Sequence, residues 1–367
     1  MDRTKNIYAD VLPRFEQGKP LVLATVLETK GSTPQIPGAS ALFSEQGLLL
    51  GTLGGGILEA DAQKKALRCL KSGRSLMYEF ELRESAVSGQ GALCGGSASI
   101  LIDGSPSAHR ETFRKLRTGL LGRRSGLLVT EMEPGQGREV AIRRFWLEEK
   151  KTTSGSMKKR WPIHPAEMEK TRREGRPRLV PIKNEKIGNA AGKEKHYFLE
   201  PLSPLPRLVI AGAGHVGRAV AHLGALLDFE VIVIDDRPEF ANQERLPEAG
   251  TIVVDDIGRA LAKLPIASDT YFVIVTRGHS NDADALRSCI KSSAAYIGMI
   301  GSRRKIALMR EEFLARGWAT AQEFDRVHAP IGLQIGSKTV EEIAVSIAAE
   351  LVQVRSGGAG EKTRESG

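Results

Sequence analysis

The sequence contains few cysteines and few aromatic residues, and it has no long hydrophobic run. The three cysteines, Cys69, Cys94 and Cys289, form no C-x-x-C pair, which excludes a disulfide framework and a zinc knuckle. No stretch reaches the roughly 18 uncharged apolar residues of a membrane span. The charged N-terminus also lacks the apolar core of a signal peptide. These absences predict a cytoplasmic protein with no membrane span.

The formal net charge of the 367-residue chain is +9, and this excess comes from one segment. Lys150–Tyr197 holds 14 Lys or Arg and 5 Glu, whereas the rest of the chain holds 39 basic and 39 acidic residues. A folded face that binds nucleic acid is itself basic. The distribution therefore argues against nucleic acid as a partner. The segment is either solvated chain, the usual case for a charge run, or a docking site for an acidic partner or anionic surface.

Length and composition predict an α/β protein with two domains. Residues 1–149 alternate short apolar runs with glycine-rich turns, which indicates a smaller α+β domain. Residues 150–200 are basic and lack apolar periodicity, which indicates a linker or insertion. Residues 201–355 alternate strand and helix patterns, which predicts a Rossmann-like, doubly wound parallel sheet. Residues 356–367 are expected to form a flexible tail.

The expected elements follow from hydrophobic periodicity and turn residues. In the N-terminal part we expect helices over 7–17 and 57–70, and strands over 21–29, 41–44, 48–52, 76–82, 98–102, 127–132 and 140–145. In the C-terminal part we expect strands over 207–211, 230–234, 251–254, 271–276 and 295–300, and helices over 216–227, 260–264, 283–292 and 303–316.

A G-x-G-x-x-G pattern joins the first strand of the C-terminal part to its first helix. Gly212 permits a tight turn, Gly214 lets a pyrophosphate approach the backbone, and Gly217 lets helix and strand pack closely. His215 lies at the helix N-terminus, where N–H groups favour an anion. The alternatives are that the glycines serve packing alone and that His215 only caps the helix.

Other candidate residues follow the later strands of the predicted sheet, where ligands bind such folds. Asp235 ends the second strand, where its carboxylate is placed to accept hydrogen bonds from the two hydroxyl groups of a ribose. The nearby Arg237 suits a 2′-phosphate instead. Arg277 and His279 follow the fourth strand. Ser302 and Arg303 follow the fifth strand, at the start of a helix suited to a phosphate. For an isolated histidine such as His279, a hydrogen bond to a loop carbonyl is the alternative.

Three glycine-containing motifs mark the N-terminal part. Ser32 and Thr33 lie in a turn with exposed hydroxyls, and Gly54, Gly55 and Gly56 precede a helix that contains Glu59. Consecutive glycines before a helix can form a backbone N–H nest for an anion. Cys94, Gly95 and Gly96 form a loop in which the thiol has no bulky neighbour on one side. Each motif has a purely structural alternative, since glycines serve turns and lone cysteines are mostly buried apolar residues.

Taken together, the chain resembles the XdhC/CoxI family, the maturation factors of molybdenum hydroxylases such as xanthine dehydrogenase. The resemblance rests on segments that occur in the family's order: ETKGSTPQIPGA, GTLGGGILEADA, CGG, IAGAGHVGRAVA with IDDRPEFA, VTRGHSNDADAL, YIGMIGSRRK and HAPIGLQIGSKTVEEIAVSIAAE. Two positions depart from the family's pattern: Gln35 stands where a basic residue is usual, and Gln334 where Asp is common.

The resemblance implies a molybdenum cofactor chaperone and not a turnover enzyme. It implies that the chain binds molybdopterin, shields it while a cysteine desulfurase supplies sulfur, and delivers it to a hydroxylase client, with the chain as a homodimer. The glycine loops would hold the phosphate, Ser32, Thr33 and Glu59 the pterin, and Cys94 would approach molybdenum or carry a persulfide. The competing hypotheses are an NAD(P)-dependent oxidoreductase acting on a small carbonyl or pterin-like substrate, and a nucleotide-sensing module without chemistry.

Overall fold

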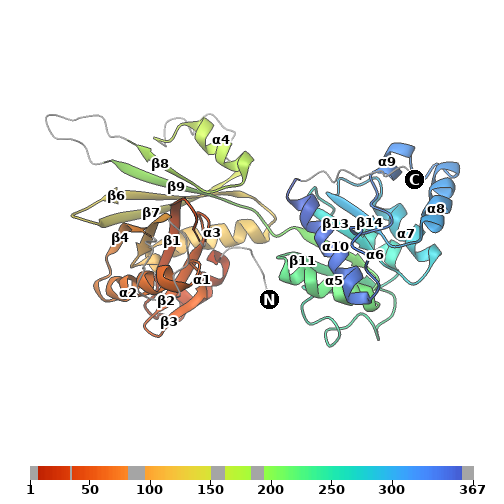
Figure 1. Cartoon of the computed structure of the whole chain (residues 1–367), viewed down its shortest axis with the longest axis horizontal. Helices are drawn as coiled ribbons and strands as arrows, with labels where there is room; N and C mark the ends of the chain where they lie inside the picture. Colours follow the sequence, from red (N-terminus) through yellow and green to blue (C-terminus); the bar gives the residue numbers. More distant parts are fainter. Residues whose placement is uncertain (1–6, 34, 82–95, 150–161, 183–193, 358–367) are drawn as a thin grey trace. The chain divides into compact units, whose positions relative to one another are not determined.

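The chain forms two compact units, one within residues 4–204 and the other within residues 205–367 (Figure 1). A computed structural model describes residues 7–33, 35–81, 96–149, 162–182 and 194–357. Each unit is built on a sheet of its own, antiparallel in the N-terminal unit and parallel in the C-terminal unit.

The N-terminal unit is a nine-stranded antiparallel sheet with helices packed on it. The strand order is β3-β2-β1-β5-β4-β7-β6-β9-β8. The strands are β1 (Val22–Lys30), β2 (Ser40–Ser44), β3 (Gly47–Gly51), β4 (Ser75–Glu81), β5 (Ser97–Asp103), β6 (Gly126–Pro134), β7 (Glu139–Glu148), β8 (Arg178–Ile182) and β9 (Lys195–Leu202). The helices are α1 (Tyr8–Glu16), α2 (Gly56–Ser72), a short 3-10 helix (Pro106–His109), α3 (Arg110–Leu121) and α4 (Pro165–Glu174).

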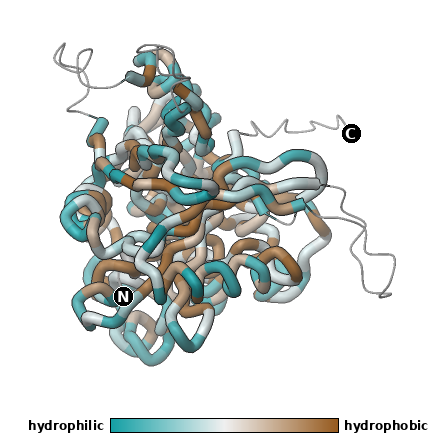
Figure 2. Tube along the Cα trace, turned by 90° about the vertical axis from the view of Figure 1, so that its left-hand side faces the viewer, coloured by the Kyte–Doolittle hydropathy of each residue, from teal (hydrophilic) through white to brown (hydrophobic). Residues whose placement is uncertain are grey.

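Side-chain alternation along β1 gives the N-terminal sheet two buried faces. Val22, Ala24 and Val26 pack with α2, whereas Leu23 packs with α1 and α3. The sheet also curls, because β8 at one end of the strand order contacts β1, and its inner face buries apolar side chains from β1, β5, β6 and β9. Figure 2, which faces this unit, shows hydrophobic strands through the middle and hydrophilic segments around them.

The described parts of the basic segment belong to this folded unit. Residues 162–182 and 194–200 contain α4, β8 and most of β9, and β9 pairs with β6. Tyr197, Phe198 and Leu199 are buried in succession because both faces of β9 are covered. A strand covered on both faces shows no polar alternation. This explains why composition indicated a linker or insertion here and did not indicate strands.

The C-terminal unit is a five-stranded parallel sheet in the order β12-β11-β10-β13-β14. The strands are β10 (Arg207–Ala211), β11 (Glu230–Asp235), β12 (Thr251–Val254), β13 (Thr270–Ile274) and β14 (Tyr296–Met299). The helices are α5 (His215–Leu226), α6 (Ile257–Lys263), α7 (His279–Cys289), α8 (Arg303–Ala315), α9 (Ala321–Asp325) and α10 (Val340–Arg355).

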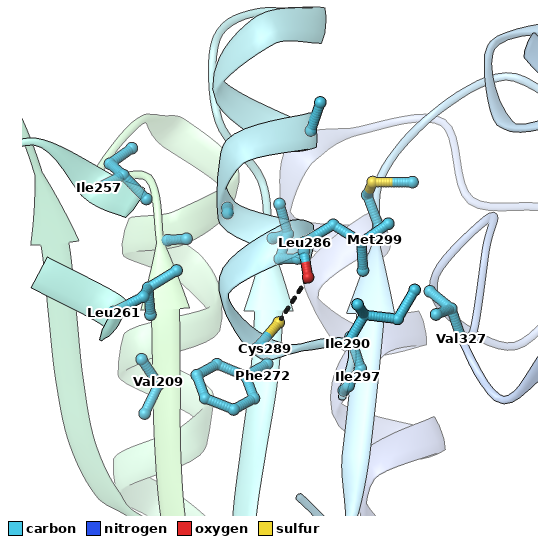
Figure 3. Close-up of a cluster of buried hydrophobic side chains, with 14 of the residues drawn as sticks. Val209, Ile257, Leu261, Phe272, Leu286, Cys289, Ile290, Ile297, Met299 and Val327 are labelled. Atoms are coloured by element: carbon cyan, nitrogen blue, oxygen red, sulfur yellow. Dashed lines mark hydrogen bonds between the residues drawn. The ribbon is translucent and has the colours of Figure 1, made fainter. Parts of the chain in front are cut away.

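Helices cover both faces of this parallel sheet. One face packs against α5 and α10, and the other packs against α6, α7 and α8. Figure 3 shows the second core, in which Cys289 is fully buried beside Phe272 and its Sγ lies 3.6 Å from the Leu286 carbonyl oxygen. Burial raises the pKa of the Cys289 thiol to about 12, so this cysteine is a core residue. The predicted fold class, a Rossmann-like C-terminal unit and an N-terminal α+β unit, is confirmed. The N-terminal unit is not the smaller one, however, because α4, β8 and β9 belong to it.

A buried polar network crosses the N-terminal unit. Arg144 forms an ion pair with Asp103, and both side chains are 2% exposed. Tyr8 of α1 donates a 2.7 Å hydrogen bond to Glu200 of β9. Burial raises the pKa of Glu200 to about 7, although the Tyr8 hydrogen bond and the nearby Arg144 oppose this shift. The network therefore contains a carboxyl group that titrates near neutral pH.

We expect this carboxyl group to make stability depend on pH. The folded pKa of Glu200 lies above the ordinary value of 4.5, so its contribution is full below pH 4.5 and is lost as pH rises through 7. The free energy of unfolding should fall by up to about 3 kcal/mol over this window. Glu200→Gln keeps an acceptor for Tyr8 and should flatten the dependence in urea titrations at several pH values. An equally steep dependence in the variant would contradict this assignment.

Candidate functional site

The G-x-G-x-x-G loop follows β10 and gives each glycine a different environment. Gly212 has φ +112°, and a Cβ there would lie 2.5 Å from the Val275 carbonyl oxygen. A Cβ at Gly217 would lie 1.9 Å from the Gly212 carbonyl oxygen, so helix α5 packs directly on the loop. A Cβ at Gly214 would meet nothing within 4 Å. The backbone at Gly214 is therefore open to a ligand.

This loop lies at the point where the strand order of the parallel sheet reverses. β10 pairs with β11 on one side and with β13 on the other, and the loops after β10 and β13 leave the same edge. The Cα of Thr276, after β13, is 3.1 Å from the Cβ position at Gly212. Arg277 donates a 2.8 Å hydrogen bond to Asp236, beyond the end of β11. Ligands bind doubly wound folds at this crevice.

Asp235 holds the glycine loop in place. Its side chain is 2% exposed and accepts hydrogen bonds from the Ala213 N–H (2.7 Å) and from Arg237 Nε (2.8 Å). Burial alone would raise the pKa of Asp235, but the hydrogen bonds from Arg237 and Ala213 outweigh it and hold the pKa below its usual value. Arg237 itself lies over the Phe240 ring, 3.9 Å from its centroid. The carboxylate expected to accept a ribose diol is thus engaged by neighbouring groups.

A second buried carboxylate, to which the sequence assigned no role, supports the other side of the crevice. Asp282 is fully buried and accepts a 2.6 Å hydrogen bond from the Thr276 hydroxyl and an ion pair from Lys305 of α8. The Ser302 hydroxyl caps α8 by accepting from the Lys305 N–H (3.3 Å). Of the remaining candidates, His215 and Arg303 are exposed, and His279 is the first residue of α7.

The N-terminal glycine run forms a second open loop, in which all three residues have positive φ. The φ values are +107° at Gly54, +70° at Gly55 and +58° at Gly56. Glu59 holds the loop from inside α2, because its Oε2 accepts from the Thr52 hydroxyl (2.8 Å) and the Leu53 N–H (3.0 Å). A Cβ at Gly55 or Gly56 would meet nothing within 4 Å. The hydrogen bonds to Glu59 therefore fix the conformation of this loop, and its backbone at Gly55 and Gly56 is accessible from outside.

The structure brings the turn at Ser32 and the loop at Gly96 together. A Cβ at Gly96 would lie 2.4 Å from the Ser32 carbonyl oxygen, so glycine is required at this approach. The Thr33 hydroxyl donates to the Gln35 carbonyl oxygen (2.9 Å), which places Gln35 in the same turn. The candidate residues Cys94 and Gly95 lie outside the described residues.

A buried network around Glu350 holds the segment 328–332, which begins the motif HAPIGLQIGSKTVEEIAVSIAAE. Glu350 of α10 accepts from Tyr296 Oη (2.6 Å) and the Gly332 N–H (2.8 Å), and it lies 2.8 Å from His328 Nδ1. Burial raises the pKa of Glu350, but the hydrogen bonds from His328, Tyr296 and Gly332 outweigh it and lower the pKa. A glutamate in an amphipathic helix gives no sequence signal for this role. Gln334, two residues further on, is exposed.

The fold and the two open glycine loops define a two-unit protein with a Rossmann-type C-terminal unit. Residues 208–351 match the family model described as the XdhC Rossmann domain, and residues 15–81 match the model of the XdhC and CoxI family. The chain belongs to the XdhC and CoxI family.

Similar proteins extend along almost the whole chain. The uncharacterized protein YqeB of Escherichia coli is 26% identical over 97% of this chain, but the chain spans about half (47%) of the length of that relative. A probable xanthine dehydrogenase subunit of Bacillus subtilis is 26% identical, with 93% of this chain and 95% of the relative covered. The molybdenum cofactor insertion chaperone PaoD of Escherichia coli is 23% identical, with 96% and 89% covered.

A crystal structure described as a xanthine dehydrogenase from Bacillus halodurans shares the fold. Its TM-score is 0.73 at 24% identity, and 98% of both chains is covered. Among the described residues, no helix is long and apolar enough to cross a membrane.

Proposed function

We propose that this chain binds molybdenum cofactor, protects it while a cysteine desulfurase supplies sulfur, and delivers it to a molybdenum hydroxylase such as xanthine dehydrogenase. The observation that carries this proposal is the similarity to the insertion chaperone PaoD, which runs along 96% of this chain and therefore includes both units. The partners are accordingly a hydroxylase client, the desulfurase and, in a homodimer, a second copy of this chain.

The open glycine loops fit the anionic part of such a cargo. Molybdopterin carries a phosphate, and backbone N–H groups at a nest or a helix N-terminus bind phosphate well. Gly55 precedes α2, Gly56 is its first residue, and Gly214 precedes α5; at each of them a Cβ would fill open space. Ser32 and Thr33 supply hydroxyl groups for polar pterin edges. Cys94, the proposed soft ligand or persulfide carrier, awaits direct substitution.

The decisive experiment is purification of the chain from cells that make molybdopterin. Molybdenum and the fluorescent oxidation product of the pterin are then measured against protein concentration. We expect both in comparable amounts, whereas their joint absence from the purified chain would refute the proposal. Mutation of Cys94 to Ser should lower sulfuration of the client without preventing folding.

A pair of alanine substitutions tests the N-terminal glycine loop. Gly55 and Gly18 have φ of +70° and +69°, and a Cβ at either meets nothing within 4 Å. Gly55 also has ψ −168°, a combination with its φ that is almost exclusive to glycine, so Gly55→Ala should cost about 1–3 kcal/mol and Gly18→Ala about 1–2 kcal/mol. Only Gly55→Ala is expected to lower the molybdenum retained, by tenfold or more, because its Cβ would stand on the binding surface. Equal retention in both variants would remove this loop from the site.

The second candidate function is an NAD(P)-dependent oxidoreductase, which the G-x-G-x-x-G geometry favours. Against it, Asp235 is occupied by Arg237 and by the loop N–H of Ala213, so a ribose diol would have to displace them. Arg237 could instead meet a 2′-phosphate. Calorimetry with NADH and with NADPH separates the functions: binding with turnover supports the oxidoreductase, and no binding of either ends it.

A further inference from the structure

A cavity of about 670 Å³ opens on the N-terminal sheet and is used by none of the glycine loops. Met77 and Leu179 contribute an apolar floor, since both pack with the core inside the curled sheet. Tyr78, between two of the lining residues, points to the opposite face and packs with α2. The cavity therefore belongs to the inner face, and its volume is in the range of small-molecule sites.

Two carboxylates and a serine form one row across this cavity. Ser99 of β5 is the register partner of Glu79 on β4 and of Glu28 on β1. The three side chains therefore share a face on adjacent strands, with the two glutamates about 10 Å apart at the backbone. Within the described part of the chain, Glu79 makes no hydrogen bond or ion pair, whereas Glu28 lies 3.6 Å from Lys30. Glu79 is thus available to a ligand.

Hydrogen-bond donors complete the lining. Arg138 borders the cavity because its carbonyl oxygen accepts the Met77 N–H (3.0 Å). His196 of β9 also lines the cavity, and its Nδ1 is buried with no hydrogen-bond partner in the described structure. The cavity combines an apolar floor, the carboxylates of glutamates, and an arginine and a histidine in its lining.

The cavity also adjoins the motifs at Ser32 and Gly96. Ser97, two residues before Ser99 on the same strand, is the register partner of Lys30 at the end of β1. The next residues in the two segments are those that make the close approach between Gly96 and Ser32. One stretch of the sheet therefore connects the cavity with two of the segments that characterise the family resemblance.

We propose that this cavity binds the 2-amino-4-oxopyrimidine edge of a pterin, a choice of ligand that rests on the proposed function. The amino group and ring N–H of this edge donate to the Glu79 carboxylate, and the ring oxo group accepts from Arg138. The flat ring lies on Met77 and Leu179. Guanine presents the same edge, whereas adenine does not. A pterin and a guanine compound can therefore be compared as ligands, with an adenine compound as the negative control.

The test is a fluorescence titration of the full chain with 6-methylpterin, with guanosine and adenosine as competitors. Glu79→Gln removes the charge of an exposed strand residue, and we expect it to weaken pterin binding by about 10- to 100-fold, the factor for a hydrogen bond to a charged group. Glu45→Gln is the matched control, since Glu45 is an exposed turn residue outside the cavity. Thermal melts of both variants check that they fold.

The outcomes separate the cavity from the proposed function. Competition by guanosine but not adenosine supports edge recognition. Tighter binding of 6-methylpterin than of guanosine supports the pterin, and tighter binding of guanosine overturns it in favour of a guanine compound. Competition by adenosine, or unchanged binding in Glu79→Gln, overturns the cavity assignment. If the chain purifies with molybdenum that Glu79→Gln retains in full, the assignment fails while the chaperone function stands. If the chain purifies without molybdenum but pterin binding depends on Glu79, the cavity assignment stands while the chaperone function fails.

Discussion

Gly217→Ala is expected to destabilise the C-terminal unit strongly. The added Cβ would lie 1.9 Å from the Gly212 carbonyl oxygen, and this neighbour is backbone that cannot rotate away. Helix α5 would have to separate from the loop and from β10, which opens the core shared by α5 and α10. We expect a loss of about 3 kcal/mol or more. Peptide-resolved hydrogen exchange should show lost protection within residues 205–357 and unchanged protection in the N-terminal unit.

Gly214→Ala, three residues away in the same loop, is the matched control. Gly214 has φ −66° and ψ −168°, which alanine adopts without strain, and its Cβ meets nothing within 4 Å. Stability should stay the same or rise by up to about 1 kcal/mol, because alanine restricts the unfolded chain. On the proposed function this variant should still retain less molybdenum. Equal stability losses in the two variants would show that close packing of Gly217 is not what the loop requires.

Arg144→Met is expected to destabilise the N-terminal unit by about 3–5 kcal/mol. The substitution leaves the Asp103 carboxylate buried without its ion-pair partner, and an uncompensated buried charge is more costly than the pair was favourable. It also removes a cation whose charge lowers the pKa of the buried Glu200. Urea denaturation at pH 7 measures the loss. The double variant Asp103→Asn with Arg144→Met should recover part of it, since neither charge then remains.

The neighbouring Arg143 provides the control for this prediction. It lies on the same strand β7 and pairs with Glu131 at 3.0 Å, but its side chain is 60% exposed. Its partner Glu131 is 10% exposed but keeps Lys195 (3.6 Å) and the Tyr197 hydroxyl (3.2 Å), so loss of the exposed guanidinium should cost about 0–1 kcal/mol. Arg143→Met should therefore change stability little. A loss as large as that of Arg144→Met would mean that removal of any arginine from β7, and not burial of the charge, is responsible.

The C-terminal fold could be predicted because its sequence pattern is local and repeated. Continuous apolar runs such as 231–234 alternate with helical stretches, and this pattern is typical of a parallel sheet covered on both faces. Helix α10 was nevertheless missed, although Thr339 and Glu342 form a capping box at its start. The N-terminal sheet was predicted in part, because β8 and β9 depend on pairing with distant β6 and not on their own composition.

The candidate site was predictable in its backbone and not in its side chains. Glycines at 54–56 and 212–217 indicated two glycine loops. The open Cβ positions at Gly55, Gly56 and Gly214 agree with ligand access, whereas Gly212 and Gly217 are closely packed, as their expected roles in the turn and the helix contact require. The sequence places Arg237 two residues after Asp235 but does not show that it folds back to form hydrogen bonds with it. That orientation depends on Phe240, over which the guanidinium lies. The position of Glu79 beside Ser99 and Glu28 likewise depends on strand register, which the sequence does not show.

Thr52 and Glu59 anchor the Gly54–Gly56 backbone from within its own chain, so on the proposed function the loop has its final shape before any cargo arrives. A preorganised loop loses little conformational entropy on capture, so more of the contact energy becomes affinity. Release then requires no unfolding of the carrier. A cargo bound in this way dissociates when an acceptor of higher affinity competes for it, which suits direct transfer from one protein to another.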